Sequence, residues 1–316
     1  MPARTVSALD LGELAQNSYQ VQEILSPGGE FEGQRPSMEV SVPTPLTAAL
    51  SNPIPLLHSP LTKGENDMSK IAWVTGAGTG IGEAAAIGLA QDGYTIVLTG
   101  RRREPLEDVA ARITAAGGEA VVETGDLGKA ADVQRIVDAI QARFGRLDLL
   151  VSNAGLNIVE RDWKRISPEG IETLINGNLF SAFYCARAVL PMMRAQGGGQ
   201  MIHTASMAGR FVSPMSGPGY AASKHAVVAM SHSINMEECG NGIRSTSLCP
   251  GEVNTPILDK RPNKLTPEQR AEMVQPEDCA NMIRYIAAQP PHVCINEVLI
   301  TPTRNRGYLA AQARPL

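Results

Sequence analysis

The sequence has few of the features that mark secreted, membrane or nucleic-acid-binding proteins. Its five cysteines, among 316 residues, show neither CxxC nor histidine-partnered spacing, so no metal site and no disulfide framework is predicted. No apolar run approaches the roughly 20 residues that cross a bilayer. The net charge of −4 and the pI near 5.8 provide no electrostatic reason to bind nucleic acid or anionic lipid. We expect a cytoplasmic chain whose cysteines are reduced and serve as small core residues.

The first 67 residues lack any sustained helical or strand period. They contain eight of the 22 prolines and carry three basic and eight acidic residues, a net charge of −5 that leaves the remainder near +1. Such a segment buries too little apolar surface to offset the entropy lost on ordering. It also lacks the basic and apolar regions of a leader sequence. Residues 1–67 are predicted to be a disordered extension or translated sequence upstream of a start at Met68, and residues 68–316 a single domain.

A glycine-rich turn follows the first segment that is typical of a buried strand. Residues 71–75 are mostly apolar, and Gly76-Ala-Gly-Thr-Gly80-Ile-Gly82 connects them to a helical stretch at 83–90. Glycines let the backbone approach a ligand, and the free N–H groups and dipole of the helix attract negative charge. The arrangement predicts a dinucleotide site.

Three arginines end the second predicted strand. An NAD site commonly carries an acidic residue at this place, which binds the ribose 2′-hydroxyl. Here Gly100 is followed by Arg101, Arg102 and Arg103, and guanidinium groups suit a 2′-phosphate. NADP is therefore favoured over NAD, although at least one of Arg102 and Arg103 is expected to be merely solvated at a helix start.

Strands and helices alternate along the rest of the chain. The predicted strands are 71–75, 94–99, 120–123, 147–152, 200–206, 243–249 and 297–301, and helical runs between them include 104–116, 131–144, 178–195 and 220–238. This alternation predicts an α/β, doubly wound, Rossmann-like fold, with a mainly parallel seven-stranded sheet and helices on both faces. Ligands of such sheets bind at the carboxyl ends of the strands.

Tyr220 and Lys224 stand four residues apart on a predicted helix, so both point the same way. A nearby ammonium favours the phenolate and lowers the pKa of the phenol, which suits proton transfer near neutral pH. Taken alone, this spacing is better explained as an exposed helical pair without a function.

Seven ordered motifs raise the significance of the Tyr220–Lys224 pair, because together they resemble the short-chain dehydrogenase/reductase family over residues 68–303. They are the turn at 75–82, Asp126, the Asn-Ala-Gly segment at 153–155, Asn178-Leu179, Ser206, the Tyr220–Lys224 pair and the segment at 250–255. Ser152 and Ala205 depart from the common pattern without removing a functional group.

The resemblance implies a catalytic set and a cofactor-binding set. The catalytic set is Asn178, Ser206, Tyr220 and Lys224. The cofactor-binding set is Gly76, Thr79, Gly80, Ile81, Gly82, Arg101, Arg102, Asp126, Leu127, Asn153, Ala154, Gly155, Tyr220, Lys224, Pro250, Gly251, Val253 and Thr255. Tyr220 would be the general acid or base, Lys224 would lower its pKa and bind the nicotinamide ribose, and Ser206 would stabilise the oxyanion. Asn178 would connect Lys224 to solvent through its carbonyl and a water.

Several of these residues have a structural alternative. Ser206 is also suited to cap the turn that follows it, Asn178 to cap its helix, and Asp126 to cap the next helix. His203, three residues before Ser206, is expected to be a buried histidine with its hydrogen bonds satisfied.

The resemblance implies an NAD(P)-dependent oxidoreductase that reversibly reduces a carbonyl of a small molecule, such as a ketone, an aldehyde or a 3-oxo compound. It also implies a homodimer or homotetramer paired through helices 178–195 and 220–238. The competing hypothesis is a catalytically idle NADP-binding sensor or scaffold. The complete set of four catalytic residues argues against that hypothesis.

Overall fold

Short apolar segments form the strands of the computed structural model, which describes residues 69–260 and 264–312. In β1 (Ile71–Thr75) every residue is buried, as expected of a parallel strand covered on both faces. The other strands are β2 (Thr95–Gly100), β3 (Ala120–Thr124), β4 (Leu149–Ser152), β5 (Gly199–Thr204), β6 (Ile243–Pro250) and β7 (Glu297–Ile300).

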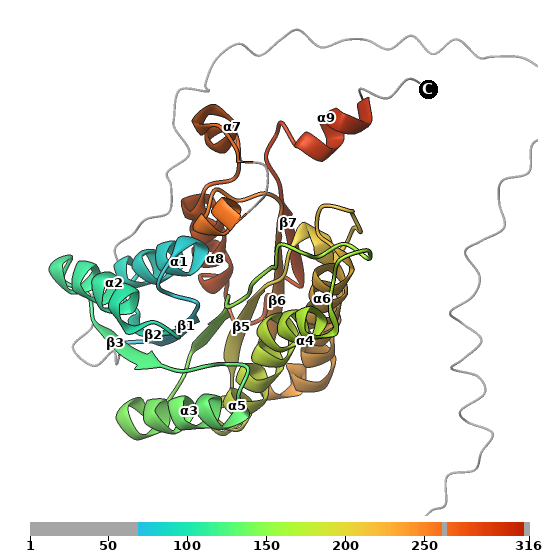
Figure 1. The fold of residues 1–316 in the computed structure, drawn as a ribbon. Coiled ribbons are helices and arrows are strands. Elements are labelled where there is room, and N and C mark those ends of the chain that lie inside the picture. The colour runs from blue at the N-terminus through green and yellow to red at the C-terminus, as the bar shows by residue number, and fades with distance from the viewer. Residues whose placement is uncertain (1–68, 261–263, 313–316) are drawn as a thin grey trace, which may run out of the picture. The chain divides into compact units, whose positions relative to one another are not determined.

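The seven strands pair in the order β3-β2-β1-β4-β5-β6-β7, and every pairing is parallel (Figure 1). The strand order reverses between β1 and β4, so their connections leave the sheet in opposite directions and open a crevice there. The predicted doubly wound, seven-stranded α/β fold is confirmed.

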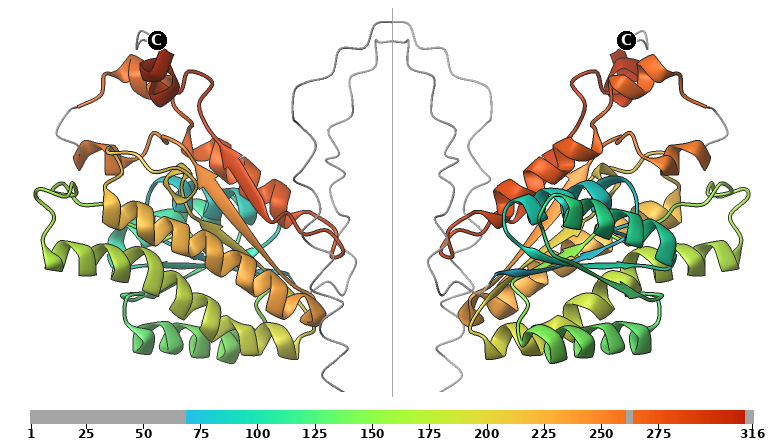
Figure 2. Two further views of the ribbon diagram at one scale, coloured as in Figure 1. Left: turned by 90° about the vertical axis from the view of Figure 1, so that its right-hand side faces the viewer. Right: turned by 90° about the vertical axis from the view of Figure 1, so that its left-hand side faces the viewer.

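Helices cover both faces of this sheet. The α-helices are α1 (Gly80–Gln91), α2 (Arg103–Ala115), α3 (Ala130–Phe144), α4 (Pro168–Ile175), α5 (Ser181–Ala195), α6 (Pro218–Glu238), α7 (Pro267–Ala271), α8 (Pro276–Ala287) and α9 (Arg306–Gln312). Short helical turns are η1 (Asn176–Phe180), η2 (Met207–Gly209), η3 (Cys239–Asn241) and η4 (Pro256–Lys260). α7 and α9 lie on the same side of the sheet's end (Figure 2), and Glu272, just after α7, pairs with Arg304, just before α9, at 3.6 Å.

Side chains alternate between two cores along each strand. Ile71 and Trp73 face the core shared with α3, α5 and α6. Ala72 and Val74 face the core shared with α1, α2 and α8. The buried Trp73 indole donates to Thr99 Oγ1 at 2.8 Å, so its polar atom is satisfied.

Two sequence-based expectations need correction. The helix predicted to start at 178 instead begins at Pro168 and continues through the π-helical η1 into α5, because Ser167 caps α4 by accepting from Gly170 N at 3.1 Å.

All five cysteines are free, but only Cys185, Cys249 and Cys279 are buried. The core role is wrong for Cys239, which follows α6 at the start of η3, and for Cys294, which precedes β7.

Other predictions remain predictions. The predicted extension at 1–67 lies outside the described residues. The single domain at 68–316, the homo-oligomer and the cytoplasmic location also stay predictions, because the structure of one chain does not test them. No described helix combines the length and the apolar character that crossing a bilayer requires.

Candidate active site

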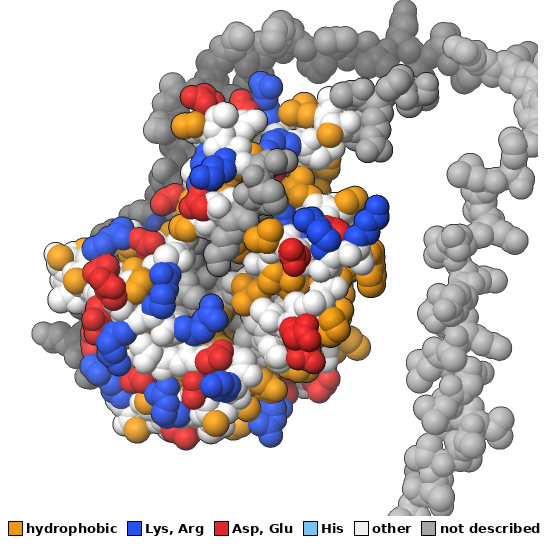
Figure 3. All heavy atoms as spheres, viewed as in Figure 1, with side chains coloured by type: hydrophobic (Ala, Val, Ile, Leu, Met, Phe, Trp, Pro, Cys, Tyr) orange, Lys and Arg blue, Asp and Glu red, His pale blue; other side chains and the backbone are white. Residues whose placement is uncertain are grey.

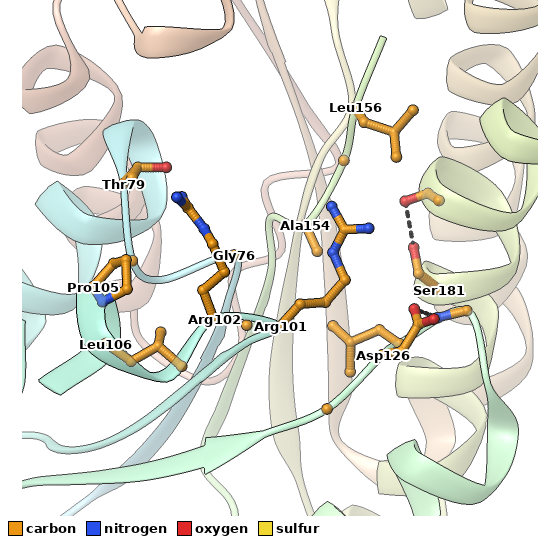
Figure 4. A pocket seen from close by; sticks show the side chains of 17 residues that line it. Gly76, Thr79, Arg101, Arg102, Pro105, Leu106, Asp126, Ala154, Leu156 and Ser181 are labelled. Atoms are coloured by element: carbon orange, nitrogen blue, oxygen red, sulfur yellow. Dashed lines mark hydrogen bonds between the residues drawn. The ribbon is translucent and has the colours of Figure 1, made fainter. Parts of the chain in front are cut away.

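A cavity of about 520 Å³ lies at the carboxyl ends of β1 to β4 (Figure 4). Its lining is Gly76, Gly78, Thr79, Gly100, Arg101, Arg102, Pro105, Leu106, Gly125, Asp126, Leu127, Gly128, Ala154, Gly155, Leu156, Gly177 and Ser181. Eight of the predicted cofactor-binding residues are in this set, while Gly80, Ile81 and Gly82 form the first turn of α1 beside it.

The glycine-rich turn is built for close backbone approach. Gly76 and Gly80 have φ of 62° and 61°, in the left-handed region that favours glycine. A Cβ on Gly82 would lie 2.3 Å from the carbonyl oxygen of Gly76. Thr79 precedes α1 without capping it by its side chain, which leaves the first N–H groups of the helix available to an anion.

Thr75 ties the glycine-rich turn to the Asn153–Gly155 segment. Its Oγ1 accepts from Asn153 N at 2.9 Å and from Ala154 N at 3.0 Å, and Asn153 Nδ2 donates to Thr75 O at 3.2 Å. Sequence reasoning assigned no role to Thr75 beyond its motif. The available signal was a hydroxyl residue at the end of an otherwise apolar predicted strand.

Asn178 holds the same segment from the other side. Its Oδ1 accepts from Leu156 N at 2.8 Å, and its Nδ2 donates to Leu156 O at 2.9 Å. Asn178 is buried within η1, and π-helical turns inside α-helices are frequent at functional sites. The alternative that Asn178 caps its helix is wrong, because the helix starts ten residues earlier at Pro168.

Arg101 and Arg102 project into the cavity, Arg102 beside Thr79 and Arg101 toward Ala154 and Ser181 (Figure 4). Neither forms an ion pair with another described residue, whereas Arg103 points elsewhere and pairs with Glu107 at 3.3 Å. Figure 3 shows basic and acidic side chains intermixed over α2 and α3. The two cavity arginines are therefore the cations available to an anionic ligand here.

Asp126 lines the cavity and also shapes its own turn. Its Oδ1 accepts from Gly128 N at 3.1 Å, while α3 begins later, after Lys129. The helix-capping alternative is wrong, because the carboxylate bonds inside the turn before the helix. Leu127 beside it is buried against the core shared with α3 and α5.

Lys224 is buried next to Tyr220, which is half-buried near the start of α6. The Lys224 Nζ lies 5.8 Å from the centroid of the Tyr220 ring and donates to Thr204 O at 2.8 Å. Burial lowers the pKa of Lys224 from its usual 10.5 to about 8. A Cβ on Gly155 would lie 3.3 Å from this Nζ and 2.9 Å from Asn178 Oδ1, so three predicted site segments meet here.

Ser206 lies two residues after Thr204 and caps the short η2 helix. Its Oγ accepts from Ala208 N at 3.1 Å, as its structural alternative predicted. Accepting occupies a lone pair and leaves the hydroxyl proton available for donation. The cap therefore fixes the side chain without removing its donor.

The segment after β6 closes the site near the glycine-rich turn. A Cβ on Gly80 would lie 3.0 Å from Thr255 Cγ2, so Thr255 packs on the start of α1. Val253 is buried and bridges to Val274, while Pro250 ends β6 and Gly251 follows it. None of these four lines the cavity itself.

His203 is the largest departure from expectation. It is fully buried, as predicted, but neither ring nitrogen has a hydrogen-bond partner among the described residues. The residues that sequence reasoning missed as cavity lining include Leu156 after β4, Gly177 of η1 and Ser181 at the start of α5, which lie far in sequence from the glycine-rich turn. Within the described ranges, no three His, Cys, Asp or Glu side chains are grouped to hold a metal ion.

The chain is similar to known proteins. A family described as "short chain dehydrogenase" matches residues 70–266. An uncharacterized oxidoreductase of Staphylococcus saprophyticus is 37% identical over 239 residues, which cover 74% of this chain and 97% of the relative.

Two solved structures are similar along nearly their whole length. An alcohol dehydrogenase from Thermococcus sibiricus, complexed with 5-hydroxy-NADP, has a TM-score of 0.67 and 29% identity, covering 78% of this chain and 99% of that one. A 3-ketoacyl-(acyl-carrier-protein) reductase from Brucella melitensis, complexed with NADH, has a TM-score of 0.67 and 26% identity, covering 75% and 98%. The chain therefore belongs to the short-chain dehydrogenase family of oxidoreductases.

Proposed function

We propose that this protein is an NADP-dependent carbonyl reductase, acting reversibly on a ketone, an aldehyde or a 3-oxo compound. The observation that carries the proposal is the buried Lys224 ammonium beside the Tyr220 ring, next to a glycine-lined cavity whose two arginines form no ion pair with a described residue. The similar structures with bound NADP derivative or NADH support the cofactor class.

The cavity fits a dinucleotide on its own geometry. The glycines of the turn at 76–82 are closely packed, most tightly at Gly82, and the first N–H groups of α1 are left without a side-chain cap. Asp126 and Leu127 would hold the adenine end, and Asn153 to Gly155 would border the ribose. Pro250, Gly251, Val253 and Thr255 would hold the carboxamide end beside Gly80.

When bound, the nicotinamide supplies the hydride, and the protein supplies position and a proton. Tyr220 gives a proton to the carbonyl oxygen in reduction and takes it back in the reverse direction. Lys224 places a positive charge near the phenol, which favours the phenolate and so the release of its proton. Ser206, held by its cap to Ala208, donates to the developing oxyanion. Asn178 fixes the loop at Leu156 and, through its carbonyl and a water, connects Lys224 to solvent.

The function is tested by incubating the full chain with NADPH and a panel of ketones, aldehydes and 3-oxo esters. We expect NADPH oxidation with at least one substrate and the reverse reaction with its alcohol. NADPH binding without turnover of any panel member would instead favour the sensor or scaffold hypothesis.

The choice of NADP over NAD rests on Arg101 and Arg102. Replacing either with alanine removes a charge-assisted hydrogen bond to the 2′-phosphate, worth about 1.5–3 kcal/mol, and is expected to weaken NADPH binding about 10- to 100-fold. NADH has no such phosphate, so its affinity should not change. Isothermal titration of both cofactors measures this.

Arg103→Ala is the matched control for these variants. Arg103 carries the same charge on the next residue but pairs with Glu107 and does not line the cavity. It should retain wild-type affinity for both cofactors. Tighter binding of NADH than NADPH by the wild-type protein would contradict the assignment.

A further inference from the structure

Two polar side chains behind the proposed active site have unmet hydrogen-bonding capacity. His203 in β5 and Ser247 in β6 are both fully buried, and neither the His203 ring nitrogens nor the Ser247 hydroxyl has a partner among the described residues. A neutral imidazole has one donor and one acceptor, and leaving both unmade costs more than an apolar side chain of the same size would. Their presence indicates a further bonded group.

The strand register places these side chains in one row. Ser152 of β4 is opposite His203, and His203 is opposite Ser247. Partners in a parallel pairing point to the same face, and this face is the one covered by α5 and α6, since Met201, Ala205 and Cys249 along the same strands belong to that core. The row therefore lies under the helix that carries Lys224.

Polar residues of α6 continue toward this row. Lys224, Ser231 and Asn235 lie seven and four residues apart, which places them on one helix face. Ser231 Oγ bonds to Ser245 Oγ at 2.7 Å, and Asn235 Nδ2 donates to Ser245 O at 2.7 Å. Ser245 and Ser247 point to the same face of β6, two residues apart. The unsatisfied groups thus lie between this bonded cluster and Lys224.

The Lys224 ammonium has further hydrogen bonds to donate. An ammonium has three donors, and one of them goes to the carbonyl of Thr204, the residue after His203. Buried water in proteins bonds to about three polar groups that would otherwise be unsatisfied. A His203 nitrogen, the Ser247 hydroxyl and the Lys224 ammonium are such a set.

We propose that His203 and Ser247 hold buried water against the Lys224 ammonium, which makes His203 a positioning residue for the Tyr220–Lys224 pair. The catalytic meaning of this contact rests on the proposed function, whereas the contact itself does not.

The electrostatics are consistent with an accepting role for His203. Burial, and secondarily the charge of Lys224, lower the pKa of His203 to about 4, so the ring is neutral at physiological pH. The other groups around Lys224 are the Tyr220 phenol on its own helix and Cys249 on β6, whose pKa is raised to about 11, first by burial. Glu297 on β7 and Arg210 after η2 lie beyond Cys249 and pair with each other at 3.0 Å.

The direction of the effect follows from these charges. Burial disfavours the Lys224 ammonium, and an accepting water favours it. Removing the acceptors should therefore lower the pKa of Lys224 further. In carbonyl reduction, the alkaline fall of kcat/KM should then move to lower pH.

The experiment is an NMR titration of the Lys224 Cε resonance in the full chain, which has seven lysines; the resonance is identified by its loss in Lys224→Met. His203→Leu should lower the midpoint by about one pH unit, the effect of about 1.4 kcal/mol. Ser247→Ala should lower the midpoint by less. His203→Asn keeps an acceptor, so its midpoint should lie close to that of the wild-type protein. The alkaline limb of kcat/KM should move in parallel.

Thr246→Val is the matched control. Its hydroxyl is equally buried and also lacks a described partner, but it adjoins Ser247 on the opposite face of β6. It should leave the Lys224 midpoint unchanged. An unchanged midpoint in His203→Leu and Ser247→Ala, or an equal shift in Thr246→Val, would overturn the proposal. Absence of turnover with every carbonyl compound would contradict the proposed function. The NMR midpoint would still test whether His203 and Ser247 hold water against Lys224.

Discussion

Replacing Tyr220 with phenylalanine is expected to lower kcat for carbonyl reduction by about 10²–10⁴-fold, the usual contribution of a positioned proton donor. The substitution removes only the hydroxyl, so the ring remains beside Lys224 and the helix start is unchanged. The NADPH dissociation constant and the unfolding midpoint should stay close to wild type. Steady-state kinetics, cofactor titration and thermal unfolding of the same preparation separate these quantities.

Tyr285→Phe provides the comparison for this variant. Tyr285 is an exposed tyrosine of α8, away from the residues of the proposed site, and loss of its hydroxyl should leave kcat unchanged. If Tyr220→Phe kept kcat within a few-fold of wild type, another group would have to supply the proton.

Replacing Gly82 with alanine is expected to be the most damaging small substitution for cofactor binding. The added Cβ would lie 2.3 Å from Gly76 O and 2.6 Å from Asn153 Nδ2, and Thr75 anchors Asn153 through two hydrogen bonds. Because the neighbours cannot retreat freely, overpacking should cost about 1–3 kcal/mol of unfolding free energy. It should also displace the turn on which the pyrophosphate would rest, with a loss of NADPH affinity of at least about tenfold.

Gly240→Ala is the control for the glycine prediction. A Cβ on Gly240 would meet no heavy atom within 4 Å, and its φ is outside the left-handed region. Its unfolding free energy should stay within about 0.5 kcal/mol of wild type. Wild-type NADPH affinity and urea midpoint in Gly82→Ala would show that the turn tolerates a side chain, contrary to the geometry.

The surface of α4 and α5 bears on the predicted homo-oligomer without testing it. Ile171 of α4, Phe180 of η1 and Phe183 of α5 are exposed by 40%, 41% and 46%. Exposed aromatic residues on one helix face are typical of protein interfaces. This supports the pairing through α5 that the family resemblance implies.

The fold could be predicted from local sequence because its signals are local. The apolar run at 71–75, the glycines that follow it and the helix-forming stretch after them lie within about 20 residues of one another. The boundaries of all seven strands were predicted to within two residues. The helix α4 was not among the predicted helices; it starts at Pro168, and Pro is well suited to the first turn of a helix.

The site was predicted less completely, for a different reason. The residue types at Tyr220, Lys224, Arg101 and Arg102 indicate their chemistry, and the tertiary structure adds which of the arginines face the cavity and that Lys224 is buried.

The sequence by itself determined the fold class and the glycine-rich turn, because both depend on residue type and spacing along the chain, and its resemblance to the family indicated the candidate catalytic residues. Only the tertiary structure decided that Asn178 lies inside a π-helical turn and clamps Leu156, that Ser206 caps η2, and that His203 lacks described partners. Hydrogen-bond satisfaction depends on every group packed around a side chain, and these groups come from strands and helices far apart in sequence. For this reason the sequence could not show that the hydrogen bonds predicted for His203 are missing among the described residues.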